Sequence, residues 1–286
     1  MSIEAPSLSQ ADLHERLLDI ACAAGEAILA VYRQQGDINV QHKSDDSPVT
    51  QADLAAHKII CQRLNELSPE IPILSEEAEM PAFEERQSWP YYWLIDPLDG
   101  TKEFIRRNDE FTVNIALIHQ HRPVLGLVHA PVLDISYLGN QLAEQPRAMK
   151  YTRQGTGNIR QEAIQCRQQI LGDPLSVVGS RRHGADALDA LLERLQQDFQ
   201  SCELLSMGSS LKLCLIAEGK AQLYPRLAPT CEWDTAAAQA VVEAAGGQVL
   251  NPDFSPLRYN HKDSLLNPDF YVVGDPRLDW ASLLRD

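Results

Sequence analysis

Apolar and polar positions recur along the chain in patterns that predict both helices and strands. Residues 10–32 carry apolar side chains at approximately helical spacing, which predicts an amphipathic first helix. A second helix is expected after Thr50, because Thr50 and Asp53 resemble a capping box ahead of further apolar residues at helical spacing. Four short apolar runs predict strands at 71–74, 91–95, 111–118 and 124–130. The last two flank a polar turn, so we expect them to pair antiparallel.

The pattern changes after a polar stretch at 139–161, in which no strand is predicted. The remainder predicts a buried strand at 175–179 and helices at 185–199, at 208–217 and from about 234 to 244. Mixed α+β structure in the first half and alternating α/β structure in the second half suit a chain of two units, which is also what 286 residues favour. We therefore predict an N-terminal lobe at 1–165 and a C-terminal lobe at 166–286.

Composition narrows the class of protein. The chain has 25 basic and 40 acidic residues, a net charge of −15, which argues against binding to nucleic acid. The negative charge of the protein would repel a phosphate ester, so another positive group must bind it. Bound divalent cations commonly supply this positive charge. No apolar run is long enough for a membrane span, so we expect a cytosolic protein. Its six scattered cysteines are expected to be reduced.

Two aspartates stand where the strand at 91–95 is predicted to end. The proline between Asp96 and Asp99 fixes one backbone angle and the glycine after them permits unusual ones. Both carboxylates and the carbonyl of Leu98 can therefore turn toward one point. Two close carboxylates repel each other unless a cation neutralises them, and Mg²⁺ prefers oxygen ligands. A surface β-turn is the alternative, but the preceding strand is too apolar for an exposed loop.

Further acids occupy the ends of other predicted elements. Glu76 and Glu77 follow a strand, and Asp53 and Asp234 stand at helix starts. Each has an ordinary structural alternative: a solvated turn for the glutamates and a helix cap for the aspartates. A helix that begins near Asp234 would also direct free N–H groups toward an anion. The hydroxyl of Thr101, paired with an aspartate, could orient and partly deprotonate a water.

Taken together, these segments resemble the inositol monophosphatase superfamily of Mg²⁺-dependent, lithium-sensitive phosphomonoesterases. Its three signatures are matched in order by Ser75-Glu76-Glu77, by Asp96-Pro97-Leu98-Asp99-Gly100-Thr101 and by Trp233-Asp234-Thr235-Ala236-Ala237. Finer similarity to the bacterial 3'(2'),5'-bisphosphate nucleotidases of this superfamily covers residues 47–50, 98–104, 110–117, 208–212 and 221–226. The resemblance spans nearly the whole chain. It implies a two-lobed αβαβα sandwich with the site between the lobes.

The resemblance also implies residue roles. The first Mg²⁺ would be bound by Glu76, Asp96 and the carbonyl of Leu98. The second would be bound by Asp96, Asp99 and Asp234, and a third ion stays open. Asp96 would bind both ions and so bridge them.

For catalysis, Asp53 and Thr101 resemble the pair that activates the attacking water, and Glu77 resembles an acid that supports the site. The implied substrate contacts are Glu76, Leu98, Asp99, Gly100, Thr101, Ser180, His183, Ser209, Lys212 and Asp234. Arg182 departs from the family pattern, because relatives often carry a small residue there.

The implied activity is hydrolysis of adenosine 3',5'-bisphosphate to AMP and phosphate, in sulfur metabolism, by direct attack of water on the 3'-phosphorus without a covalent phosphoenzyme. A phosphatase for inositol or sugar phosphates would share every metal ligand and is the first alternative. A non-catalytic module that senses metal or phosphate is the second, and the presence of Asp53 and Thr101 argues against it. Oligomeric state and association with the inner face of a membrane, described for some relatives, stay open.

Overall fold

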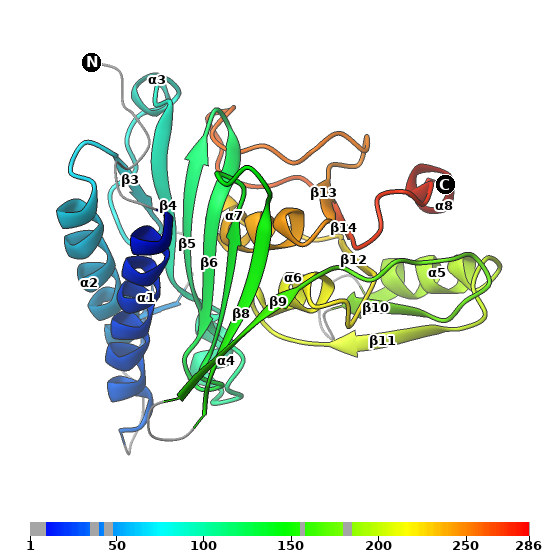
Figure 1. Ribbon diagram of the computed structural model, residues 1–286, viewed down its shortest axis with the longest axis horizontal. Helices are drawn as coiled ribbons and strands as arrows, with labels where there is room; N and C mark the ends of the chain where they lie inside the picture. The colour runs from blue at the N-terminus through cyan, green and yellow to red at the C-terminus, as the bar shows by residue number, and fades with distance from the viewer. Residues whose placement is uncertain (1–9, 35–39, 43–47, 155–157, 180–184, 286) are drawn as a thin grey trace.

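The computed structural model describes residues 10–34, 40–42, 48–154, 158–179 and 185–285. Within these ranges the elements stack in five layers, with helices alternating with sheets (Figure 1). The three helical layers hold α1 (Gln10–Tyr32) with α2 (Gln51–Leu67), α6 (Leu211–Ala217) with α7 (Glu232–Ala244), and α5 (Ala185–Leu195) with α8 (Trp280–Leu284). The αβαβα sandwich is therefore confirmed.

The larger sheet has seven strands in the order β3-β4-β5-β6-β7-β8-β9. These are β3 (Ile73–Ser75), β4 (Tyr91–Asp99), β5 (Thr112–His119), β6 (Arg122–Ala130), β7 (Ile135–Asn140), β8 (Arg147–Gln154) and β9 (Asn158–Ile164). Strand β3 is parallel to β4, and every other neighbouring pair is antiparallel, including the predicted pair β5 and β6.

Both faces of this sheet are buried. In β4, Trp93 and Ile95 pack into the core cluster that includes α1 and α2, whereas Tyr92 and Leu94 pack into the cluster that includes α6 and α7. Successive side chains of a strand point to opposite faces, so a strand covered on both sides needs a continuous apolar run. This is why β4 is apolar throughout the run that leads to its acidic end.

The smaller sheet has five strands in the order β11-β10-β12-β14-β13. These are β10 (Leu175–Gly179), β11 (Cys202–Ser206), β12 (Leu223–Arg226), β13 (Gln248–Leu250) and β14 (Phe270–Val273). The remaining elements are the pair β1 (Val40–His42) and β2 (Pro48–Thr50), and the short helices α3 (Phe83–Arg86) and α4 (Thr101–Ile105). Helix α4 directly follows the acidic end of β4.

Helix α7 lies unusually close to the larger sheet. A Cβ atom added to Gly126 would stand 2.2 Å from the carbonyl oxygen of Ala237, and one added to Gly139 would stand 2.3 Å from that of Ala240. Glycine at these two strand positions is therefore required for this packing. The close approach brings the first turn of α7 near the C-terminal end of β4.

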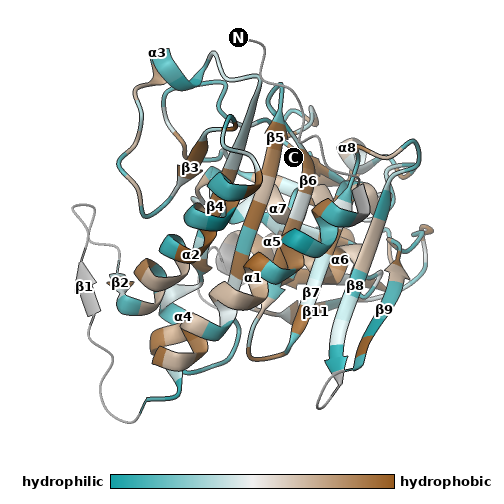
Figure 2. Ribbon diagram, turned by 60° about the vertical axis from the view of Figure 1, so that its left-hand side comes forward, coloured by the Kyte–Doolittle hydropathy of each residue, from teal (hydrophilic) through white to brown (hydrophobic). Residues whose placement is uncertain are grey.

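Several predicted elements are confirmed, including the first helix and the strand at 175–179. The stretch at 139–161 is different from the prediction, because β8 and β9 form there and extend the sheet. Most residues of the two strands are hydrophilic, so neither strand has the apolar alternation that marks a half-buried strand (Figure 2).

Other boundaries also differ. Strand β4, predicted to end before Asp96, continues to Asp99 through a register shift, and α5 ends at Leu195 rather than at 199. Helix α6 begins at Leu211 rather than at 208. All six cysteines are free thiols, as predicted. Among the described residues, no helix has the length and apolar composition needed to cross a bilayer. The lobe boundary at 165 stays a prediction.

Candidate active site

The acidic end of β4 forms a tight turn in which Asp96 is 1% exposed. The register of β4 against β5 shifts between Asp96 and Asp99, and the N–H of Leu98 donates to Oδ1 of Asp96 at 3.0 Å. Gly100 then adopts the left-handed conformation with φ 94° and starts α4. The turn therefore holds Asp96 and Asp99 on one side of the chain, as predicted.

Asp99 is fixed by neighbours from two other elements. Its Oδ2 accepts from the N–H of Ser210 at 2.6 Å, and the hydroxyl of Ser210 lies 2.7 Å from the same atom. Thr112 and Asn114 of β5 approach that oxygen at 3.4 Å each. Sequence reasoning missed these supporting residues. Two polar side chains within an otherwise apolar buried strand were the available signal, because a buried polar group needs a partner.

Asp234 belongs to the first turn of α7. It is the third residue of the helix, and its Oδ2 accepts from the N–H of Cys231 at 2.8 Å. Asp234 is therefore not the N-cap, which is Cys231, but it caps the helix from the third position and also lies close to the other acids. One carboxylate oxygen each from Asp96, Asp99 and Asp234 lies within 4.8 Å of the others. Ser210 connects two of these residues, since its hydroxyl is also 2.7 Å from the main-chain oxygen of Asp234.

The turn after β3 brings Glu76 beside this group. Its N–H donates to the main-chain oxygen of Ile95 at 3.3 Å, next to Asp96. The carboxyl groups of Glu76 and Asp96 are close enough to share a hydrogen bond. The next residue, Glu77, donates its N–H to the hydroxyl of Ser75 at 3.3 Å. The backbone of Glu77 thus lies in the same turn as Glu76.

Crowding changes the acidity of these carboxyls. Burial, together with the nearby charges of Glu76, Asp99 and Asp234, raises the pKa of Asp96 well above its usual range. Burial and the charge of Asp99 raise the pKa of Asp234 in the same way. Close, buried carboxylates become compatible as anions when a cation lies among them. The donor set is composed of oxygen alone, which fits Mg²⁺.

Asp53 is held next to this group by the cap of α2. Oδ2 of Asp53 accepts from the N–H and the hydroxyl of Thr50 at 2.8 and 2.6 Å, so the predicted capping box is present. Its other oxygen, Oδ1, lies 3.3 Å from the hydroxyl of Thr101. Burial raises the pKa of Asp53, against the lowering effect of the Thr50 bonds, and the charge of Glu76 adds to the rise.

A cavity of about 200 Å³ opens beside the acids. Its lining includes Asp99, Gly100, Ser209, Lys212 and Asp234. Among the described residues, the hydroxyl of Ser209 is buried without a hydrogen-bond partner. The ammonium of Lys212 donates to the main-chain oxygen of Met207 at 3.4 Å and lies 5.9 Å from the centre of the Tyr224 ring. Burial lowers the pKa of Lys212. The hydroxyl of Ser209 and the ammonium of Lys212 thus line a cavity that an anion could enter.

The structure brings most of the predicted site residues together. The carbonyl of Leu98 lies 3.4 Å from the hydroxyl of Thr101, close to the acidic turn. The predicted substrate contacts Ser180 and His183, and Arg182 between them, lie outside the described residues.

The fold and the acidic site define a member of a phosphatase family. The sequence profile of the Inositol monophosphatase family matches residues 10–276. The chain belongs to this family, whose members are metal-dependent, typically on Mg²⁺.

Individual relatives narrow the comparison to one branch of the family. The chain is 49% identical to the 3'(2'),5'-bisphosphate nucleotidase CysQ of Salmonella typhimurium (strain LT2) over 262 residues, which cover 91% of this chain and 98% of that protein. It is 48% identical to the CysQ of Escherichia coli O6:H1, with 90% and 98% covered. The crystal structure of CysQ from Bacteroides thetaiotaomicron superposes with a TM-score of 0.77 at 39% identity, and the match covers 91% of this chain and 96% of that one.

Proposed function

We propose that this chain is a 3'(2'),5'-bisphosphate nucleotidase that hydrolyses adenosine 3',5'-bisphosphate to AMP and phosphate. The observation that carries the proposal is the convergence of Asp96, Asp99 and Asp234 beside a cavity that also exposes Lys212. The carboxylates suit a metal-assisted phosphatase, and the buried cation suits a substrate with a second phosphate. The high identity to CysQ proteins over nearly the whole chain supports the same activity. A cytosolic location and a role in sulfur metabolism belong to the same proposal.

The proposed metal ligands fall into two sets that share Asp96. Glu76, Asp96 and the carbonyl of Leu98 form the first set. Asp96, Asp99 and Asp234 form the second, and the proposal is for two Mg²⁺ ions with a third left open. When bound, such ions lower the pKa of a water and stabilise charge on the departing oxygen.

Asp53 is the proposed acceptor of the water's proton. Two donors from Thr50 fix its Oδ2, so that Oδ1 is left to face Thr101. The hydroxyl of Thr101 can donate to the carbonyl of Leu98 or to Asp53 and can accept from a water, which orients that water. A raised pKa brings the carboxylate of Asp53 nearer to the range in which it accepts a proton effectively. Glu77 is proposed to support this arrangement from the neighbouring turn.

The cavity residues are the proposed contacts to the nucleotide. Lys212 would pair with the phosphate that does not react, and Ser209 would donate its free hydroxyl to the same molecule. A charge-assisted hydrogen bond in a buried setting is stronger than one in water. Gly100 has no side chain, so its backbone can approach the substrate closely, and its φ of 94° is one that other residues rarely adopt.

An assay of phosphate release tests the proposal. We expect Mg²⁺-dependent release from adenosine 3',5'-bisphosphate, loss of release in EDTA, and a much lower kcat/KM for inositol 1-phosphate. A higher kcat/KM for inositol 1-phosphate would favour the sugar-phosphate alternative, which shares the metal ligands. Absence of release from both substrates at saturating Mg²⁺ would support a non-catalytic module instead.

A further inference from the structure

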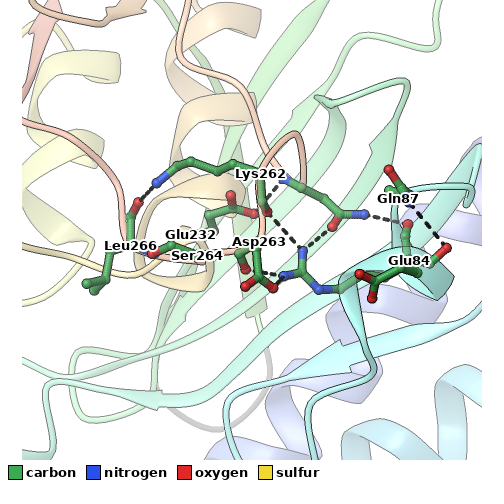
Figure 3. Close-up of polar contacts among 9 residues, drawn as sticks. Glu84, Gln87, Glu232, Lys262, Asp263, Ser264 and Leu266 are labelled. Atoms are coloured by element: carbon green, nitrogen blue, oxygen red, sulfur yellow. Dashed lines mark hydrogen bonds and ion pairs between the residues drawn. The ribbon is translucent and has the colours of Figure 1, made fainter.

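A buried arginine on α3 is hydrogen-bonded to the loop that holds the first residue of α7, the helix that carries Asp234. Arg86 ends helix α3, and its side chain is 3% exposed. Its guanidinium donates to the side-chain oxygen of Asn260 and to the main-chain oxygens of Lys262 and Asp263. The side-chain amide of Asn260 donates in return to the main-chain oxygen of Arg86 at 2.7 Å. Figure 3 shows this group of contacts around Lys262 and Asp263.

Asn260 continues the connection to helix α7. Its N–H donates to Oε2 of Glu232 at 2.8 Å, and Glu232 is the first residue of α7. The N–H of Glu232 donates to the main-chain oxygen of Leu265 at 2.9 Å. Glu232 is thus fixed to the same loop by its side chain and by its main chain. Asp234 follows two residues later in the same helical turn, so the position of Glu232 determines that of Asp234.

On its other side, Arg86 belongs to the segment that precedes strand β4 of the larger sheet. Arg86 lies between the turn that carries Glu76 and the start of β4 at Tyr91. Removing one partner from a buried, hydrogen-bonded charge is strongly destabilising. Arg86 therefore has one favoured position relative to the loop that holds Glu232. The two segments that supply Glu76 and Asp234 are linked through it.

We infer that Arg86, Asn260 and Glu232 form a brace that positions Asp234 against the carboxylates of the larger sheet and thereby sets the affinity for the divalent cation. The inference rests on the proposed function, because it requires the acidic site to take such a cation. None of the three residues lines the cavity, so they are positioning residues. Partners outside the ligands of a metal typically change its affinity about 10- to 100-fold when they are mutated.

Direct binding of Mn²⁺ to the full chain, followed by the EPR signal of free Mn²⁺, tests the brace without relying on turnover. Glu232→Ala should weaken Mn²⁺ binding about tenfold, while the KM for the nucleotide at saturating metal changes little. Glu232→Gln should restore affinity close to that of the wild type, because its amide oxygen can still accept from Asn260. Equal losses in both variants would overturn the inference.

A second variant breaks the brace at a different contact. Asn260→Gly removes the oxygen that accepts from Arg86 and keeps the backbone N–H that binds Glu232. Glycine also suits the left-handed φ of 52° at this position. We expect it to weaken Mn²⁺ binding as well, so the inference can be tested even if Glu232→Ala does not fold.

The matched control is Lys150→Ala, which breaks another largely buried ion pair, between Lys150 and Glu218 at 3.0 Å. It should lower the melting temperature and leave Mn²⁺ affinity unchanged. The inference is overturned if the brace variants behave in the same way, losing stability alone. Failure of the wild type to bind Mn²⁺ would instead refute the proposed metal site itself, so the two failures are distinguishable.

Discussion

At the scale of single residues, the site contains charge that costs stability without its cation. Asp96 is almost fully buried and surrounded by other acids, and its pKa is raised for that reason. A residue chosen for stability alone would be neutral here, since uncompensated buried charge is unfavourable. Retaining a carboxylate at this position makes sense when its function is to bind a cation.

Replacing this carboxylate should abolish most activity. Asp96→Asn removes one charge from both proposed metal sites, and we expect kcat to fall by at least about 10³-fold, equivalent to about 4 kcal/mol. The check is phosphate release at saturating Mg²⁺, with the exposed Asp189→Asn on α5 as the control. A near-normal kcat for Asp96→Asn would refute its assignment as a shared ligand.

Lys212 should affect binding more than chemistry. Lys212→Ala is expected to raise the KM for adenosine 3',5'-bisphosphate about tenfold or more, since hydrogen bonds to charged groups contribute about 1.5–3 kcal/mol. The KM for adenosine 3'-monophosphate, which lacks the second phosphate, should change little. Steady-state kinetics on both substrates measures this, and an equal loss on the two would contradict the proposed contact.

The sequence identifies the acids of the site but not what holds them. Asp96, Asp99 and Asp234 were recognisable because they stand at predicted element ends within matched motifs. Ser210, which contacts both Asp99 and the main chain of Asp234, gave no separate signal. Its partners lie 111 and 24 residues away, and only the folded chain brings them together.

At the scale of elements, the site depends on how closely α7 approaches the larger sheet. Gly126 and Gly139 leave no room for a side chain beneath the helix. The small residues of α7 therefore do more than fill the core, because their packing sets the distance between Asp234 and the acidic end of β4.

Gly126→Ala should weaken both packing and metal binding. The added methyl group would displace α7, and overpacking of this kind costs about 1–3 kcal/mol. We expect a lower melting temperature together with a higher half-saturating Mg²⁺ concentration. Gly274→Ala is the control, since its added Cβ would meet nothing closer than 3.6 Å. If Gly126→Ala needs the same Mg²⁺ concentration as the wild type, the packing of α7 against the sheet does not determine metal binding.

Element prediction was best where one face or both faces of an element are buried. The first helix was predicted with correct ends because its apolar positions repeat at helical spacing. Strand β9 was missed because it is an edge strand and most of its side chains are exposed. Strand β8 was missed because most of its residues are polar. Pairing with a neighbour, rather than a local pattern, makes this segment a strand.

At the scale of the whole molecule, the sandwich gathers acids from separate layers into one place. Glu76 and Asp96 come from the larger sheet, Asp53 from the outer helices and Asp234 from the central helix. A chain of net charge −15 that acts on an anionic nucleotide needs local positive charge, and bound cations with Lys212 would supply it. A bound cation should therefore also stabilise the fold.

Mg²⁺ should raise the melting temperature of the wild type. A ligand at 100 times its Kd stabilises by about 2.7 kcal/mol, which corresponds to a rise of about 5 °C or more for a chain of this size. Asp96→Asn should melt higher than the wild type in EDTA, because it removes buried charge, and should respond little to Mg²⁺. Differential scanning calorimetry measures both effects. A wild type that melts at the same temperature with and without Mg²⁺ would contradict the prediction.

The layered architecture was predictable only through the family resemblance. The spacing of apolar residues predicted the helices and most central strands, but it did not predict the order of the layers. The Arg86 brace illustrates why, since its contacts join residues 174 positions apart in the chain. Such pairings depend on the complete fold, and no spacing in the sequence marks them.

The most direct measurement is anomalous X-ray diffraction from crystals of the protein soaked in Mn²⁺. We expect one peak among the carboxylates of Asp96, Asp99 and Asp234, and a second beside Glu76, Asp96 and the carbonyl of Leu98. Crystals that show Mn²⁺ elsewhere in the molecule, with none at these carboxylates, would contradict this expectation.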